Sequence, residues 1–242
     1  MKQVLCRVID NRILWADVSI LTFDAPELAR AIRPSQFALA RDATTFDPYL
    51  RRTLWLYSID SNRVAFTLAA HDPLASRARP GDLIDLLAPI GHTIDFAAHA
   101  KRMLLISEGT RALQLMATAH DAIVNKREVV FTCIATDNFP IHLLSPEIEF
   151  RADAELNSEL IAWADALVAS GSSDLYRALG EAARAARYRL EPGFARVLID
   201  LPMPCGTGAC GACSVDTTRG VKFACVDGPA FDLVEFENRR AR

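Results

Sequence analysis

The chain has 242 residues, which is enough for one large domain or two ordinary ones. Apolar residues make up 51% of the chain and charged residues 24%, so the composition is that of a globular protein and excludes a disordered one. The formal net charge of −3 argues against a nucleic-acid partner. Since no apolar run approaches the roughly 20 residues of a membrane span, no such span is predicted.

Residues 1–97 are predicted to form a β-rich domain. Many short apolar runs separated by turns are typical of a barrel or a sandwich. A short helix is expected at 24–30, with Asp24 as its N-cap and Pro26 in its first turn. Strands are predicted at 4–9, 13–23, 37–41, 53–59, 63–68 and 83–87.

Residues 98–192 alternate between strand and helix patterns, which predicts a doubly wound parallel sheet. Apolar runs typical of buried strands lie at 102–106, 129–135, 148–152 and 166–169. Helical periodicity covers 110–126, 156–163 and 174–188. A last strand at 196–201 leads into the cysteine-rich remainder of the chain.

The segment from 205 to 213 carries the chain's most specific motif, C-x4-C-x2-C, followed after eleven residues by a fourth cysteine. This spacing is that of [2Fe–2S] ligands in plant-type ferredoxins. Gly206, Gly208 and Gly211 allow positive φ angles, so backbone amides can approach the cluster sulfurs. The fourth cysteine is expected on a strand at 221–225. The predicted ligands are Cys205, Cys210, Cys213 and Cys225.

Two other uses of these cysteines are disfavoured. Zinc ribbons prefer two C-x2-C pairs, which the C-x4-C arm does not match. Disulfides are not expected because residues 1–9 lack the apolar run of a secretory signal. Cys6 and Cys133 lie in apolar runs and are predicted to be buried, unreactive thiols. Together these features favour a cytoplasmic location.

Five segments occur in an order that resembles a known family. They are Pro34–Phe37, Tyr49–Trp55, Pro80–Gly91, the cysteine motif and Phe223–Asp232. The chain resembles the iron–sulfur electron-transfer subunit of class 1B dihydroorotate dehydrogenases. It equally resembles the small subunit of NADH-dependent ferredoxin–NADP reductases and sulfide dehydrogenases. Those small reductase subunits typically have Asp at the first ligand position, where this chain has Cys205 as the dihydroorotate group does.

The resemblance implies a ferredoxin-reductase-like fold in three parts. Residues 1–97 would form an antiparallel flavin-type β-barrel. Residues 98–192 would form a doubly wound, nucleotide-binding-like α/β domain, and residues 193–242 a small C-terminal [2Fe–2S] lobe.

The resemblance also implies an FAD site on the barrel, and here the chain departs from the family. The family's Arg-Pro-x-Ser/Thr strand aligns with 52–55, so a tryptophan replaces the hydroxyl. The phosphate-binding turn aligns with 69–72 and ends in a carboxylate, which repels phosphate. Two interpretations remain open: FAD binds, or the barrel is a scaffold that has lost its flavin. The candidate FAD residues are Arg52, Thr53, Trp55, His71 and Asp72.

NAD(P) binding is not expected. Relatives carry a glycine-rich loop after the first strand of the α/β domain, where backbone amides approach a pyrophosphate. The corresponding stretch here, 107–114, keeps only Gly109, and Glu108 adds a negative charge beside the implied phosphate position. The family's later Cys-Gly-Pro turn is Ser170-Gly171-Ser172 in this chain.

These observations predict an iron–sulfur electron-transfer subunit of a multi-subunit oxidoreductase, which relays single electrons through a [2Fe–2S] cluster. A catalytic or flavoprotein subunit would be its partner, with a ferredoxin as a further candidate. No catalytic side chain is predicted. Two alternatives remain open: a complete FAD/[2Fe–2S] subunit that oxidises NAD(P)H, and a redox-sensing or structural iron–sulfur protein.

Overall fold

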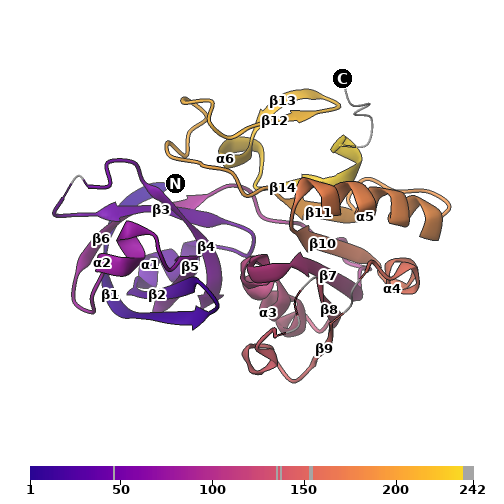
Figure 1. Ribbon diagram of the computed structural model, residues 1–242, viewed down its shortest axis with the longest axis horizontal. Helices are drawn as coiled ribbons and strands as arrows, with labels where there is room; N and C mark the ends of the chain where they lie inside the picture. Colours follow the sequence, from indigo (N-terminus) through magenta and orange to yellow (C-terminus); the bar gives the residue numbers. More distant parts are fainter. Residues whose placement is uncertain (46, 135, 137, 153–154, 237–242) are drawn as a thin grey trace. The chain divides into compact units, whose positions relative to one another are not determined.

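In the computed structural model, which describes residues 1–45, 47–134, 136, 138–152 and 155–236, six antiparallel strands close a barrel (Figure 1). Their order around the barrel is β1-β2-β5-β4-β3-β6. The barrel predicted from the sequence is therefore confirmed. The strands are β1 (Lys2–Trp15), β2 (Val18–Asp24), β3 (Phe37–Asp42), β4 (Arg52–Ile59), β5 (Arg63–Ala69) and β6 (Leu83–Ile90).

Two local predictions in the barrel were wrong. The strand expected at 13–23 is interrupted at Ala16, where φ is +48° and the chain turns from β1 into β2. Helix α1 (Pro26–Ala31) has Ala25 as its N-cap, while Asp24 is the last residue of β2 and pairs with β5. Pro26 does occupy the first turn, as predicted. A second short helix, α2 (Pro73–Arg77), follows β5.

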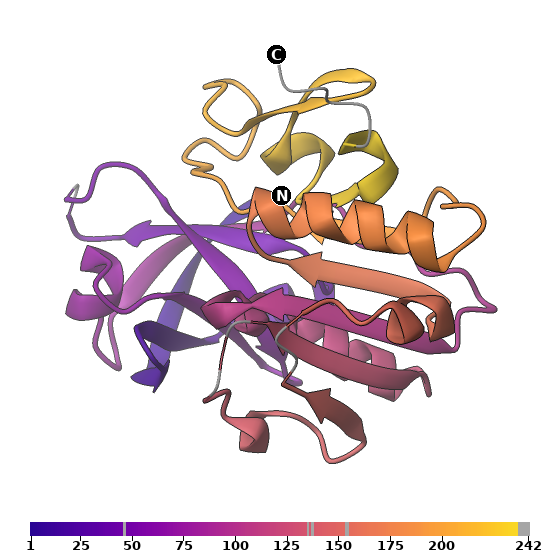
Figure 2. The same ribbon diagram turned by 45° about the vertical axis from the view of Figure 1, so that its right-hand side comes forward.

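The α/β part is built on a six-stranded sheet with the order β14-β11-β10-β7-β8-β9. Figure 2 shows the molecule from a second angle. Every neighbouring pair is parallel except β11 with β14, which is antiparallel. The predicted parallel sheet is thus confirmed, with an antiparallel edge strand added. The strands are β7 (Arg102–Glu108), β8 (Glu128–Ile134), β9 (Ile148–Arg151), β10 (Ala166–Ser170), β11 (Ala195–Leu198) and β14 (Ala230–Asp232).

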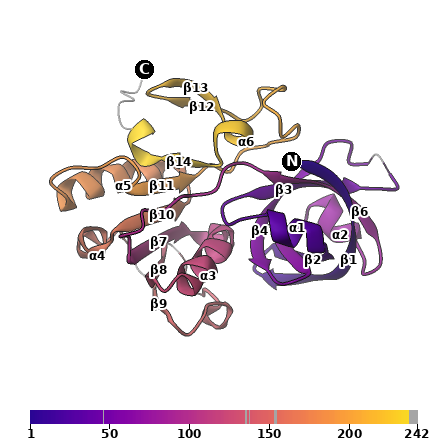
Figure 3. The same cartoon turned by 180° about the vertical axis from the view of Figure 1, so that it is seen from behind.

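Helices cover both faces of this sheet, with α5 on one face and α3 on the other (Figures 1 and 3). The helix predicted at 110–126 begins instead as a 3-10 helix, η1, and becomes α-helical only at Met116. Side chains of Asn157 and Ser172 cap α4 and α5. The helices are η1 (Gly109–Leu115), α3 (Met116–Val124), η2 (Ile141–Leu143), α4 (Ser158–Trp163) and α5 (Ser173–Ala186).

The last part of the chain contains a small hairpin and two short helices. These elements are β12 (Ser214–Thr217), β13 (Gly220–Phe223), α6 (Ala224–Asp227) and, after β14, η3 (Leu233–Phe236). No helix within the described ranges is long and apolar enough to cross a bilayer. Ala135, at the end of a predicted strand, and residues 237–242 of the predicted C-terminal lobe lie outside the described residues.

The chain divides into two compact units. The barrel unit comprises 1–93, 200–214 and 223–229. The sheet unit comprises 94–199, 215–222 and the segment from 230 onward. The cysteine loop and the fourth cysteine thus belong to the same unit as the barrel.

A carboxylate joins the starts of two central strands in the sheet unit. Asp165, just before β10, accepts hydrogen bonds from the backbone N–H groups of Lys101 and Arg102, at 3.0 and 2.9 Å. The guanidinium of Arg102 donates a third at 2.7 Å. The Arg102 hydrogen bond is the main reason that the pKa of Asp165 lies well below its usual value of 3.8.

We predict that Asp165→Asn destabilises the protein at neutral pH and that this difference shrinks under acid conditions. A carboxylate with a lowered folded pKa stabilises the fold above its unfolded pKa, and this contribution is lost as the pH falls below 3.8. Urea unfolding at neutral and acid pH measures the difference. Asp174→Asn, in an exposed pair with Arg177, is the control and should change stability little. Equal losses in the two variants would contradict the prediction.

Candidate iron–sulfur site

The four predicted ligands converge within the barrel unit, on the loop after β11 and on the short helix α6. Cys213 and Cys225 are 0% and 3% exposed, whereas Cys205 is half-buried and Cys210 is exposed. The expectation that a strand carries Cys225 was wrong, because β13 ends at Phe223 and Cys225 lies in α6. None of the six cysteines forms a disulfide.

The backbone directs amide hydrogens at the cysteine sulfurs. Gly208 N donates to Cys225 Sγ at 3.2 Å, and Thr207 N donates to Cys205 Sγ at 3.5 Å. Cys213 Sγ lies 3.4 Å from Cys225 Sγ. Such N–H···S contacts favour the thiolate form, which is the form that binds metal.

The thiols of Cys205 and Cys225 differ in their pKa. Burial, followed by the neighbouring Cys213 thiol, raises the pKa of Cys225 to about 12. Burial also raises the pKa of Cys205, but hydrogen bonds from the backbone of Thr207 and Cys210 outweigh it and lower the value to about 6. A thiolate is therefore accessible at neutral pH at Cys205, whereas the Cys225 thiol stays protonated unless a nearby positive charge favours its ionisation.

The cysteine sulfurs do not surround a single point. Zinc requires its ligands around one point, with Zn–S distances of about 2.3 Å. Among the described residues, no three His, Cys, Asp or Glu side chains are arranged in that way. The sulfurs of Cys213 and Cys225 are in contact, so these two cysteines could share one iron of a [2Fe–2S] cluster.

Glycines make the tight loop possible, as the sequence predicted. Gly206, Gly208 and Gly211 have φ angles of +67°, +76° and +71°. A Cβ on Gly206 would lie only 2.9 Å from side-chain carbons of Leu39 and Ile90, so the loop lies directly against β3 and β6. Since Gly211 has open space around it, only its φ angle requires glycine.

We predict that Gly206→Ala lowers iron occupancy and stability more than Gly211→Ala. Both substitutions place a side chain at positive φ, which costs about 1–2 kcal/mol, but only Gly206→Ala also pushes the loop off the barrel. Iron per chain and the midpoint of thermal unfolding measure the difference. If the two variants behave alike, packing against β3 and β6 does not hold the loop.

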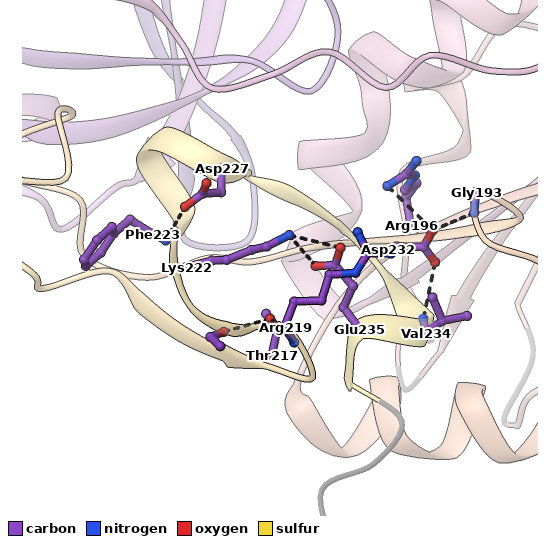
Figure 4. Close-up of polar contacts among 11 residues, drawn as sticks. Gly193, Arg196, Thr217, Arg219, Lys222, Phe223, Asp227, Asp232, Val234 and Glu235 are labelled. Atoms are coloured by element: carbon purple, nitrogen blue, oxygen red, sulfur yellow. Dashed lines mark hydrogen bonds and ion pairs between the residues drawn. The ribbon is translucent and has the colours of Figure 1, made fainter.

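Polar contacts that no sequence motif indicated hold the segments on either side of Cys225 (Figure 4). Asp227 accepts a hydrogen bond from Phe223 N at 2.7 Å, which closes the turn carrying Cys225. In the sheet unit, Lys222 Nζ lies 3.0 and 2.9 Å from the two carboxylate oxygens of Glu235, which is 8% exposed. The ammonium of the half-buried Lys222 thus contacts both oxygens of the buried carboxylate, which compensates its charge locally. The apolar sequence neighbours of Glu235 are the one signal in the sequence that could have indicated its burial.

The structure brings together Arg52 and Asp72, two of the predicted FAD residues. Arg52 Nε lies 3.2 Å from Asp72 Oδ2, although the angle is poor for a hydrogen bond and Nε is buried without another partner in the described part of the chain. Asp72 also caps α2 by accepting from Leu74 N at 2.9 Å. The cation expected to meet a phosphate therefore already faces a carboxylate.

The other predicted FAD residues point elsewhere. Trp55 is 6% exposed, and its Nε1 donates to Asp200 Oδ1 at 3.2 Å. The imidazole of His71 is exposed, with Nδ1 3.9 Å from an Asp17 oxygen. Thr53 lies on β4 opposite Leu39. The contact between Trp55 and Asp200, which stands five residues before Cys205, was not anticipated from the sequence.

The fold, a closed barrel and a parallel sheet with an antiparallel edge, is the one found in ferredoxin-reductase-like proteins, and the four cysteines follow the last parallel strand. Residues 202–237 match the family described as the iron–sulfur cluster binding domain of dihydroorotate dehydrogenase B. The chain is 26% identical over 255 residues to the dihydroorotate dehydrogenase B (NAD(+)) electron transfer subunit of Geobacillus thermodenitrificans, covering 93% of this chain and 94% of that one. The Aquifex aeolicus homolog of this subunit is 22% identical, covering 97% and 98%.

Solved structures agree with this assignment of the fold. The structure of an NADH-dependent reduced ferredoxin–NADP oxidoreductase superposes with a TM-score of 0.74 and 20% identity, covering 96% of this chain and 89% of the other. The ferredoxin reductase in carbazole 1,9a-dioxygenase superposes with a TM-score of 0.57 and 15% identity, covering 76% and 65%. The resemblance predicted from the sequence, to both the dihydroorotate dehydrogenase subunit and the ferredoxin–NADP reductase, is confirmed.

Proposed function

We propose that the chain is an iron–sulfur electron-transfer subunit of a multi-subunit oxidoreductase, and that Cys205, Cys210, Cys213 and Cys225 hold a [2Fe–2S] cluster. The observation that carries the proposal is a set of four thiols free of disulfides, three on the loop and one in α6, two of which accept backbone hydrogen bonds. The family match over the same residues supports it. Bound there, a [2Fe–2S] cluster would accept and release one electron at a time.

The chain's own residues would hold this group and set its access to solvent. Cys213 and Cys225, in the barrel unit, are buried, while Cys210 is exposed. An electron would therefore enter or leave most directly on the Cys210 side, where a partner's redox centre can approach. The N–H donors of Gly208 and Thr207 would offset negative charge on the sulfurs.

The partner in this proposal is a catalytic or flavoprotein subunit. Relatives are named as electron transfer subunits of dihydroorotate dehydrogenase B, which implies a second subunit where the substrate reacts. A ferredoxin is a further candidate, because a fold neighbour is titled a reduced ferredoxin–NADP oxidoreductase. Four reduced thiols are best preserved in a reducing compartment, so we propose a cytoplasmic location.

We predict that the anaerobically purified protein contains two irons and two acid-labile sulfides per chain. Cys213→Ser should lose most of the iron, because its sulfur lies at the buried centre of the site. Cys6→Ala is the control: Cys6 is a buried thiol on β1 and lies outside the cysteine motif, so its loss should leave the iron content unchanged. Metal analysis and the electron paramagnetic resonance spectrum of the reduced protein report the result. Zinc without iron would refute the proposal.

A second candidate, the complete FAD/[2Fe–2S] electron-transfer subunit, is favoured by the closed barrel and by Arg52 at the start of β4. Against strong binding stand the Arg52–Asp72 pair and the buried indole of Trp55. Losing two hydrogen bonds to charged or polar ligand atoms costs about 1.5–3 kcal/mol each. The two observations together support an FAD that is weakly held or shared with a partner chain.

We predict that FAD is lost on gel filtration and that Asp72→Asn strengthens its binding by about tenfold, as expected when a like charge beside a phosphate is neutralised. Asn keeps the helix cap, so this change removes the charge alone. Arg52→Ala should weaken any FAD binding. Equilibrium titration with FAD measures the affinity of the wild type and of the two variants. Stoichiometric FAD on the purified wild type would contradict weak binding and favour the complete flavoprotein.

The remaining alternative is a redox-sensing iron–sulfur protein. Such a sensor would bind a partner with an affinity that depends on the cluster's redox state.

A further inference from the structure

The sheet unit has a crevice position where doubly wound proteins usually bind a ligand. The chain runs from β7 outward through β8 and β9, then returns to β10 on the other side of β7 and continues to β11. The switch point therefore lies between β7 and β10, at their carboxyl ends. Ligands of such sheets bind outside this point, between the two loops that diverge there.

In this chain, a hydrogen bond joins those two loops directly. Glu108, the last residue of β7, accepts the backbone N–H of Ser172 through Oε2 at 2.7 Å. Ser172 is the N-cap of α5, a 14-residue helix whose N-terminal end carries partial positive charge. The carboxylate thus meets the same kind of donor that a ligand phosphate would meet.

The surrounding contacts fit this carboxylate closely. A Cβ added to Gly171 would lie 3.1 Å from Glu108 Oε2, so the missing side chain lets the carboxylate reach the loop. Behind it, the buried Ser170 hydroxyl donates to Gln114 Oε1 at 2.5 Å and ties β10 to η1. Gly171 N donates to the Tyr176 hydroxyl at 2.9 Å. Both loops are therefore fixed by the protein's own side chains.

We infer that Glu108 is an internal anion that closes the switch-point crevice against the phosphates of a nucleotide. The carboxylate accepts the hydrogen bond of the backbone N–H at the start of α5, so a phosphate cannot accept that bond at the same time. Its negative charge also repels a second anion. The sheet unit then acts as a scaffold, and electrons reach the iron–sulfur site from a partner chain. This closure involves only the sheet unit and stands independently of what the cysteine loop holds.

The test compares wild type, Glu108→Ala, Glu108→Gln and the control Glu147→Ala, which removes an exposed carboxylate in the turn before β9. Calorimetric titration with NADH and with inorganic pyrophosphate measures binding, and hydrogen exchange measures protection of the Ser172 amide. Iron content is followed in every variant, so a failure of the cluster proposal is recognised separately.

The expected result is no saturable binding to wild type or Glu147→Ala at micromolar ligand. Glu108→Ala should lose protection at Ser172 and bind pyrophosphate at least about tenfold more tightly than wild type. Glu108→Gln keeps an acceptor for the Ser172 amide but not the charge, so protection should remain while affinity rises, and it serves as the test if the alanine variant does not fold. Micromolar binding of NADH by wild type overturns the inference. So does unchanged pyrophosphate affinity in both Glu108 variants.

Discussion

In the proposed site, four sulfur atoms would have to reach two irons from a nine-residue loop and one residue beyond it, and this requirement would govern the cysteine region. An extended loop would place the sulfurs too far apart, so the backbone curls through three glycines with positive φ. The same curl turns amide hydrogens of Gly208 and Thr207 toward sulfur. Gly206 brings the loop against Leu39 and Ile90, so the barrel, whatever else it binds, is the platform on which the cysteines are ordered.

The sequence predicted those parts of the structure in which the residue pattern is compatible with one local structure only. Cysteine spacing with interleaved glycines indicated the convergent loop, and apolar periodicity indicated the barrel and the parallel sheet. The errors occurred where the local pattern was ambiguous. The β1–β2 turn uses Ala16 at positive φ, a residue with no turn preference. Asp24 looks like a helix cap but completes a strand, since its pairing with β5 extends that far.

Contacts between distant segments could not be predicted in the same way. The hydrogen bond from Trp55 to Asp200 spans 145 residues and the one from Ser172 to Glu108 spans 64, and neither residue pair forms a motif. The sequence did show that Glu108 and Asp72 stand at implied phosphate positions. It could not show that each carboxylate already has a partner inside the protein, because that depends on how loops from separate strands approach one another.

Asp72 and Glu108 are alike in their physical chemistry, although they lie in different units. Each stands beside the N-terminus of a helix, one as the cap of α2 and the other against the cap of α5. A carboxylate there satisfies a backbone donor in every molecule, whereas a dissociable phosphate does so only when it is bound. In our proposal, these internal anions stabilise the ligand-free loops and disfavour nucleotide entry. The cysteine site differs, because the raised pKa of the Cys225 thiol is one that a bound metal's positive charge would lower. The local contacts therefore oppose nucleotide binding at the two implied phosphate positions but do not oppose cluster binding at the cysteines.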